Sequence, residues 1–211
     1  MANAVLAAQT GNNRLSVDNC VLLFVDHQTG LMQLVRDYAP DEFKNNILAL
    51  AAIGKLYNLP TILTTSFETG PNGPIVPELK AAFPHAPFIA RPGEINAWDN
   101  PDFVKAVKAT GKKKIIIAGI VTDVCVALPT LSALAEGFDV YVVADASGTT
   151  DVATRNIAHS RMTHAGAIVT NWFSLVSELH RDWRHNGAGL KKLLQDYMIP
   201  YQNLIYSHET K

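Results

Sequence analysis

Three residues of the sequence carry side chains that could together break a covalent bond: Asp26, Arg91 and Cys125. Asp26 follows the apolar run VLLFV, Arg91 ends the segment PFIAR, and Cys125 lies in GIVTDVC. A thiol near a helix N-terminus is acidified by the backbone N–H groups and the helix dipole. A carboxylate can accept the thiol proton, a cation can hold the thiolate, and nearby backbone N–H groups can stabilise an oxyanion. The trio therefore has the composition of a nucleophilic site.

Each member of the trio also has a structural interpretation. A single cysteine is most often a small buried apolar residue, and an aspartate at the end of a strand often belongs to a turn or cap. The other cysteine, Cys20, opens the first predicted strand at the opposite edge of the sheet, and we expect a structural role for it. The residue pattern alone leaves catalysis and packing open for Cys125.

The elements that must position the trio alternate between short β-branched runs and helical patterns. The runs predict strands over 21–26, 61–67, 87–91, 114–120, 140–145 and 167–171. The patterns between and after them predict helices over 41–57, 101–110, 123–136, 151–165, 173–183 and 187–197. This alternation predicts an α/β fold, a three-layer α/β/α sandwich with a mostly parallel six-stranded sheet. Ligands bind at the carboxyl ends of such strands, where the trio is expected to meet.

The length and composition of the chain limit its possible domain organisation and the classes of partner that it can bind. We expect 211 residues to form one domain over 19–185, preceded by an arm over 1–18 and followed by a helical, oligomer-contact segment over 186–211. Hydrophobic residues at 48% and charged residues at 18% are typical of a globular protein. A net charge of −1 means that the chain has no excess of positive charge to attract nucleic acid or an anionic membrane surface. Two distant cysteines and a poor N-terminal signal favour a cytoplasmic protein.

Two long segments resemble a known family. IIIAGIVTDVCVALPTLSALAEGFDVYVVADASGT (115–149) is similar to the cysteine segment of the isochorismatase-like cysteine hydrolases, and LLFVDHQTGLM (22–32) is similar to their aspartate strand. The resemblance spans about residues 19 to 180, and it implies that family's Rossmann-like fold. IARPGEINAWDNPDFVKAVKATGKK (89–113) and ELHRDWR (178–184) resemble the YcaC-like subgroup.

The resemblance implies a hydrolase that cleaves a non-peptide carbon–nitrogen bond of a small molecule through a thioester. Asp26 would be the general base and Cys125 the nucleophile of a catalytic triad. Arg91 stands where the family usually has lysine, a change of bulk and geometry that keeps the charge. The backbone N–H groups of Val121 and Cys125 would form the oxyanion hole, with a cis peptide between Ile120 and Val121.

The loops supply further expectations. The turn-rich loop over 66–77 is a candidate lid. Nicotinamidases, relatives in this family, bring an aspartate and two histidines together after the second strand, where this chain reads SFETGPNGP. We therefore expect no metal and no cofactor. The expected substrate contacts are Phe67, Glu68, Glu94, Asn96 and Trp98, with a core or interface position as the alternative for Trp98.

The resemblance also implies self-association. The YcaC-like subgroup suggests a homo-octamer, in which Tyr197, Tyr201 and Tyr206 could supply contacts between subunits. Two other uses of the fold stay open at this point. Cys125 could be a redox-responsive thiol, or the protein could be a catalytically weak or non-catalytic scaffold because Arg91 replaces lysine.

Overall fold

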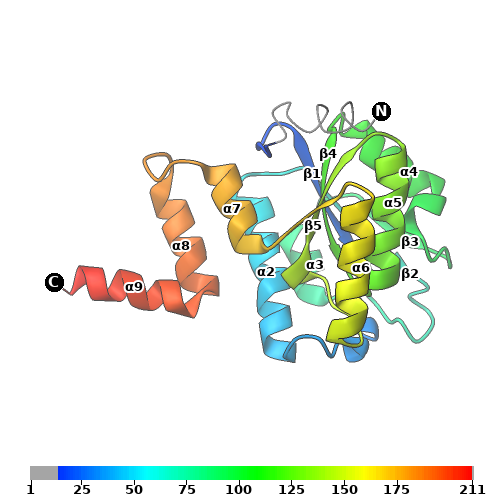
Figure 1. Cartoon of the computed structure of the whole chain (residues 1–211), viewed down its shortest axis with the longest axis horizontal. Coiled ribbons are helices and arrows are strands. Elements are labelled where there is room, and N and C mark those ends of the chain that lie inside the picture. The colour runs from blue at the N-terminus through cyan, green and yellow to red at the C-terminus, as the bar shows by residue number, and fades with distance from the viewer. Residues whose placement is uncertain (1–13, 211) are drawn as a thin grey trace.

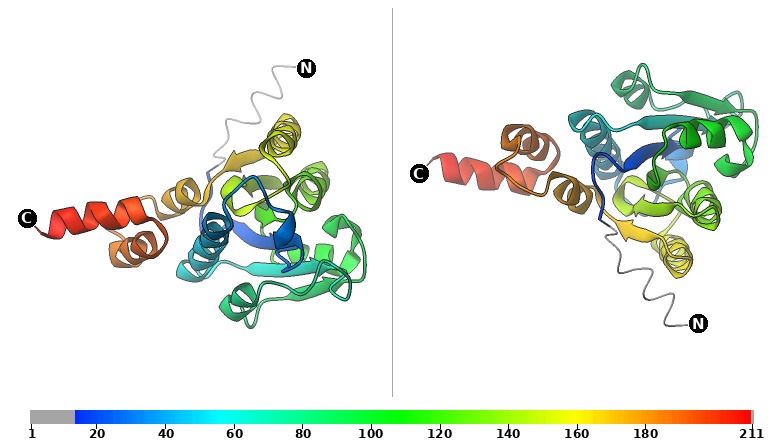
Figure 2. Two further views of the ribbon diagram at one scale, coloured as in Figure 1. Left: turned by 90° about the horizontal axis from the view of Figure 1, so that it is seen from below. Right: turned by 90° about the horizontal axis from the view of Figure 1, so that it is seen from above.

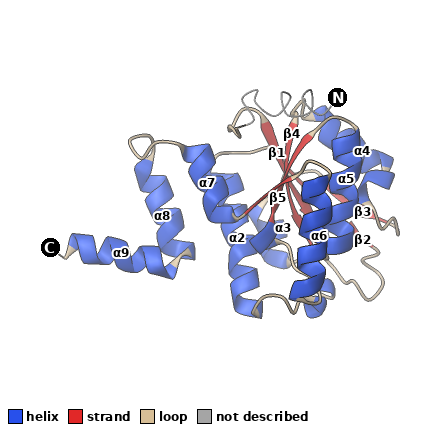
Figure 3. Cartoon of the chain, in the orientation of Figure 1, coloured by secondary structure: helices blue, strands red, loops and turns tan. Residues whose placement is uncertain are grey.

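A computed structural model describes residues 14–210, and in this part of the chain six parallel strands form one sheet (Figures 1 and 3). The sheet order is β3-β2-β1-β4-β5-β6. The strands are β1 (Cys20–Val25), β2 (Thr61–Ser66), β3 (Phe88–Arg91), β4 (Lys114–Gly119), β5 (Asp139–Val143) and β6 (Ile168–Thr170). The six predicted strands and the parallel α/β sandwich are confirmed. Because all strands are parallel, the carboxyl ends of β1, β3 and β4 lie at the same edge of the sheet.

Helices cover both faces of the sheet, because alternate residues of the buried strands point to opposite sides. Leu22 and Phe24 of β1 pack in one core with α2 (Pro40–Leu56), α3 (Pro77–Ala82) and α7 (Trp172–His180). Val21 and Leu23 pack in a second core with α4 (Pro101–Ala109), α5 (Ala127–Ala135) and α6 (Val152–His164). Short helical turns complete this part of the chain: η1 (Leu31–Leu34), η2 (Ala97–Asp99), η3 (Thr122–Val126) and η4 (Ala144–Ala146).

The C-terminal segment consists of α8 (Gly187–Tyr197) and α9 (Ile199–Glu209), which extend away from the sandwich as an arm (Figures 1 and 2). The sequence pattern predicts α8 but not α9. A single residue of α9, Ile205, is buried, so this helix has no apolar stripe from which periodicity could predict it. The helix α3 is missed for a related reason, since its six residues bury only Leu79.

The predicted N-terminal arm lies mostly outside the described residues, which begin at Arg14. Its described end packs on the domain: Leu15 is fully buried, and its N–H donates to Glu178 Oε1 at 2.6 Å. Among residues 14–210, no helix combines the length and the apolar character needed to cross a bilayer.

Candidate active site

Three strand ends deliver the trio to the carboxyl edge of the sheet. Asp26 directly follows β1, Arg91 is the last residue of β3, and Cys125 lies in η3, the turn that follows β4. The backbone N–H of Asp26 donates to the carbonyl of Thr64 at 2.9 Å, which fixes the end of β1 against β2. Residues far apart in the sequence therefore meet here, as the topology predicts.

Arg91 and Asp26 form a fully buried ion pair. Their side chains are 0% exposed, and Nη2 of Arg91 donates to Asp26 Oδ1. The remaining guanidinium groups are also bound: Nε donates to Thr64 Oγ1 at 3.0 Å, and Nη1 donates to the carbonyl of Glu94. A lysine would offer one ammonium here, whereas the planar fork of arginine reaches three acceptors at once. The guanidinium is thus held in place and holds the carboxylate in turn.

The second oxygen of Asp26 is the unusual atom of the pair. Oδ2 is buried and accepts no hydrogen bond from a nitrogen or oxygen atom of residues 14–210. A buried carboxylate oxygen without a donor is costly, and such groups are enriched at functional sites. Burial raises the pKa of Asp26, against the opposing effects of the Arg91 charge and of hydrogen bonds from Arg91 and Cys125. A raised pKa makes this carboxylate a stronger base.

Cys125 lies beside Asp26 in a π-helical turn, and its thiol is not acidified. Burial is the main cause that raises its pKa above that of an ordinary cysteine, and the neighbouring Asp26 charge raises it further. The backbone N–H of Val121 and the charge of Arg91 act in the opposite direction. The acidification that a helix N-terminus would give this thiol is therefore not found in the protein without substrate. The predicted helix over 123–136 begins as an α-helix only at Ala127, so the thiol lies before the regular helix and within reach of a carboxylate.

The backbone before Cys125 has the expected cis peptide between Ile120 and Val121. The N–H of Val121 acts on the Cys125 sulfur, which puts one of the two expected oxyanion donors next to the reacting atom. The carbonyl of Val121 accepts from the N–H groups of Val124 and Val126, both at 3.2 Å. These bonds hold the turn so that the Val121 N–H faces the thiol.

The expected substrate contacts are divided by the structure into one exposed side chain and four engaged ones. Phe67 is 48% exposed and has a φ of 50°, so it stands out from the edge of the sheet directly after β2. Glu68 Oε1 accepts from the N–H of Ile75 at 3.3 Å and braces the loop over 66–77. The Glu94 carboxylate accepts from Asn100 at 3.1 Å, while its carbonyl binds Arg91. Glu94 therefore contributes to the site through its backbone.

Asn96 and Trp98 are engaged within the chain, and their expected contacts with substrate stay a prediction. Asn96 caps η2 by accepting from the N–H of Trp98 at 3.0 Å. The Trp98 ring is 8% exposed, packs edge-on against Phe103 and Phe138, and donates to Glu136 at 2.9 Å. The structure supports the core alternative for Trp98, because the ring is buried against these aromatic partners and its single donor is bound.

Sequence reasoning missed two residues that build the site. The Thr64 hydroxyl accepts from Arg91 and donates to the carbonyl of Ile89 at 2.8 Å. The Gln28 side chain pins the end of β2, accepting from the N–H of Ser66 at 2.9 Å and donating to its carbonyl at 3.0 Å. The signal was a hydroxyl in the middle of the buried run TILTTS, where an apolar residue is expected.

Known proteins of one family are similar to this chain over most of its length. The isochorismatase domain model matches residues 20–173. The chain is 62% identical to the probable hydrolase YcaC of Escherichia coli over 93% of this chain and 95% of that protein. The crystal structure of that YcaC, described as an octameric hydrolase of unknown specificity, superposes with a TM-score of 0.94 over 95% of this chain and 98% of that chain.

A second solved structure is YcaC from Pseudomonas aeruginosa with hexane-2,5-diol and covalent acrylamide. It is 65% identical, with a TM-score of 0.93 over 94% of this chain and 98% of that chain. The domain match covers most of the described chain, and the likeness to these two YcaC proteins extends over nearly all of it. The chain therefore belongs to the isochorismatase family, and its similarity to YcaC confirms the subgroup that its sequence motifs indicate.

Proposed function

We propose that this protein is a cysteine hydrolase that cleaves a non-peptide carbon–nitrogen bond of a small amide-like molecule through a thioester. One observation carries the proposal: a buried carboxylate with a raised pKa, one oxygen of which has no nitrogen or oxygen donor among residues 14–210, lies beside the partly buried Cys125 thiol. A nucleophile next to a base, with the base oriented by a third group, is the arrangement that activates a thiol. Here Arg91 is the orienting group.

The geometry supports the following steps. As Cys125 Sγ bonds to the carbonyl carbon, its proton passes to the Asp26 carboxylate. The carbonyl oxygen becomes an oxyanion that accepts from the Val121 N–H and, as we propose, from the Cys125 N–H. The carbon–nitrogen bond then breaks, and Asp26 returns the proton to the leaving nitrogen. Water, deprotonated by Asp26, attacks the thioester, the carbon–sulfur bond breaks to release the acid, and Asp26 returns its proton to the Cys125 sulfur.

The raised pKa values fit this cycle. A neutral thiol beside a basic carboxylate stores the proton on sulfur until the substrate arrives, so no free thiolate is exposed to oxidants. The alternative of a redox-responsive thiol is disfavoured by the same feature, because redox-sensing cysteines have low pKa values and open surroundings. The P. aeruginosa relative, with its covalent acrylamide, supports a reactive nucleophile and a pocket that admits a small uncharged amide.

Release of ammonia or amine from a panel of small uncharged amides tests the proposal. The wild-type protein should hydrolyse at least one of them, and Cys125→Ala should lose the activity by about 10³-fold or more. The matched control is Cys20→Ala, which removes the other cysteine, a buried residue whose raised pKa of about 11 results mainly from burial. Equal turnover by both variants would contradict the nucleophile assignment. A folded protein that hydrolyses none of the amides would favour the scaffold alternative.

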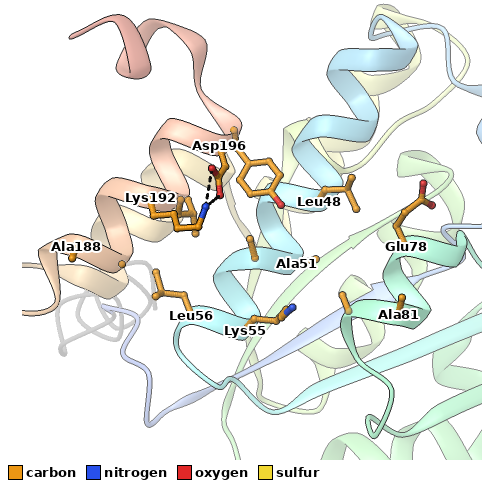
Figure 4. A pocket seen from close by; sticks show the side chains of 14 residues that line it. Leu48, Ala51, Lys55, Leu56, Glu78, Ala81, Ala188, Lys192 and Asp196 are labelled. Atoms are coloured by element: carbon orange, nitrogen blue, oxygen red, sulfur yellow. Dashed lines mark hydrogen bonds and ion pairs between the residues drawn. The ribbon is translucent and has the colours of Figure 1, made fainter. Parts of the chain in front are cut away.

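We also propose that the chain assembles with copies of itself, as an octamer like the E. coli relative. Two apolar surfaces support this. The arm exposes Ile199, Leu204 and Tyr206 of α9 at 72%, 59% and 70%. A groove of about 720 Å³ between α2, α3 and α8 is lined by apolar residues that include Ala51, Leu56, Ala81 and Ala188, and by charged ones that include Lys55 and Asp196 (Figure 4).

A second copy of this chain is the occupant that we propose for these surfaces. The groove and the exposed residues of α9 belong to one continuous part of the molecule, because α8 lines the groove and carries α9. Small residues let another backbone approach closely, and exposed apolar patches of this kind mark contacts between proteins. Of the three tyrosines expected at subunit contacts, Tyr206 is freely exposed and Tyr197 lines the groove. Tyr201 is stacked on Trp183, with ring centroids 6.0 Å apart.

A further inference from the structure

Thr149, in the segment between η4 and α6, makes three hydrogen bonds that reach two separate parts of the chain. This residue is fully buried. Its hydroxyl donates to Asp123 Oδ1 at 2.6 Å, and its N–H donates to Asp37 Oδ1 at 2.9 Å. Its carbonyl accepts from the N–H of Arg36 at 2.8 Å. Every polar group of Thr149 is therefore committed to a partner distant in sequence.

The hydroxyl bond reaches the nucleophile turn. Asp123 lies two residues before Cys125 within η3. At the start of the same turn, the Thr122 N–H donates to the carbonyl of Gly148 at 3.0 Å. Two consecutive residues of the turn are thus tied to two consecutive residues of the 148–149 segment, once through the backbone and once through side chains.

The 148–149 segment is itself fixed in place. A Cβ at Gly148 would come within 2.7 Å of the Val35 side chain, so the backbone packs closely there. Asp37, the acceptor of the Thr149 N–H, has its carbonyl bound by Arg155 Nη1 at 3.2 Å, and this guanidinium lies 4.7 Å from the Tyr38 ring centroid. The attachment runs without a break from α6 to the turn that carries Cys125.

We propose that the hydrogen bond from Thr149 to Asp123 is a positioning device that keeps the Cys125 thiol against the Asp26 carboxylate and the Val121 N–H. This inference rests on the proposed function of Cys125 as nucleophile. Thr149 does not touch the reacting atoms and acts through the turn. Without the bond, the first half of η3 keeps only its backbone attachment, so the thiol can move away from Asp26 toward solvent.

The pH dependence of Cys125 alkylation by iodoacetamide tests this inference, with peptide mass spectrometry separating Cys125 from Cys20. Asp26 and Arg91 are the charged groups that act on the thiol. Thr149→Val should lower the alkylation midpoint by about half a pH unit or more, toward the free-cysteine value of about 8.5, since burial and the Asp26 charge then raise it less. Thr149→Ser keeps the hydroxyl and should retain the wild-type profile.

The matched control is Thr130→Val, which removes another fully buried threonine hydroxyl, one that has no partner among residues 14–210. It should leave the midpoint unchanged. A folded Thr149→Val protein with the wild-type profile would overturn the inference, as would an equal shift in the serine variant.

A second pair of variants protects the test against misfolding at the buried position. Asp123→Ala removes the acceptor and should shift the midpoint further than Asp123→Asn, which loses the charge but keeps an oxygen for Thr149. Equal shifts in the two would assign the effect to charge and overturn the inference. A wild-type midpoint that does not respond to Asp26→Asn would instead overturn the proposed function.

Discussion

The carboxyl edge of the sheet and the C-terminal arm differ in how far their side chains are buried and paired. At the edge, Arg91 is 1% exposed as a whole residue, and every nitrogen of its guanidinium has a protein acceptor. In the arm, Ile199 is 72% exposed and Leu204 is 59% exposed. Buried charges must be paired within the chain, whereas exposed apolar surface is stabilised by whatever covers it. The proposed catalytic centre is thus assembled within one chain, whereas the arm has the exposed apolar surface on which the proposed contact with a neighbour rests.

Removing the buried Arg91 cation should have the largest effect on the stability of the protein. Arg91→Met leaves the Asp26 carboxylate buried without its partner, and the free energy of unfolding should fall by about 3–5 kcal/mol. Urea unfolding at fixed protein concentration measures this. Lys108→Met is the matched control, because Lys108 forms a half-exposed pair with Glu136 at 2.7 Å and should cost no more than about 1 kcal/mol. Equal losses in both variants would contradict a paired buried charge.

A lysine at position 91 separates the contribution of the positive charge from that of the guanidinium geometry. Arg91→Lys keeps the charge beside Asp26 but loses the contacts of the guanidinium fork with Thr64 and Glu94. Its stability should lie between those of the wild type and Arg91→Met in the same urea experiment. A lysine variant as unstable as the methionine variant would show that geometry, rather than charge, holds the pair.

His27, the residue after Asp26, should produce the next largest effect, seen as a pH dependence of stability. His27 is fully buried, donates from Nε2 to the carbonyl of Ala146 at 3.0 Å, and has no partner for Nδ1 among residues 14–210. Burial lowers the pKa of His27 from 6.5 to about 4. The unfolded chain therefore binds the proton first, and stability is lost as the pH falls from about 6.5 toward 4.

This difference in pKa corresponds to about 3 kcal/mol, at about 1.4 kcal/mol for each unit. Buried carboxyls such as Asp145, whose pKa burial raises to about 6, act in the opposite direction. The informative quantity is thus the difference between the wild type and His27→Gln, which keeps the donor to Ala146 but does not titrate. The wild-type curve should fall more steeply with acid. Parallel curves would show that His27 contributes nothing to the pH dependence.

A charge on the arm should have the smallest effect on the protomer and a clear effect on assembly. Leu204→Asp changes an exposed side chain, so the intrinsic stability of the protomer should change by no more than about 0.5 kcal/mol. Sedimentation should nevertheless show smaller species, because a charge then lies on the proposed contact surface. Gln202→Glu adds a charge at another exposed position of α9 as the control. An intact oligomer in the leucine variant would remove Leu204 from the proposed interface.

The sequence predicts most of the fold because buried parallel strands are continuous apolar runs that end in polar residues. Asp26 and Arg91 are found by this rule, and the topology brings them together. The thiol environment is not predictable in the same way. Whether Cys125 lies at an open helix N-terminus or in a π turn against a carboxylate depends on local backbone geometry that residue types do not encode.

The substrate side of the site was harder to predict for a related reason. Asn96 and Trp98 follow the right strand, but their polar atoms are used within the chain, by η2 and by Glu136. Position along a strand gives the edge on which a residue lies, but not the partner that its side chain selects. Thr64 shows the reverse case, since it is a polar residue that periodicity assigns to packing and that instead binds Arg91.

We propose that Asp26 and Cys125 share one proton. The decisive test is the pH dependence of Cys125 alkylation, compared between the wild type and Asp26→Asn. In the wild type, the midpoint should lie above the free-cysteine value of about 8.5. Asp26→Asn removes the negative charge beside the sulfur, so the midpoint should fall and alkylation at neutral pH should become faster. Amide hydrolysis should nevertheless be lost, because the base is gone. An unchanged midpoint, or hydrolysis that survives the substitution, would contradict the account.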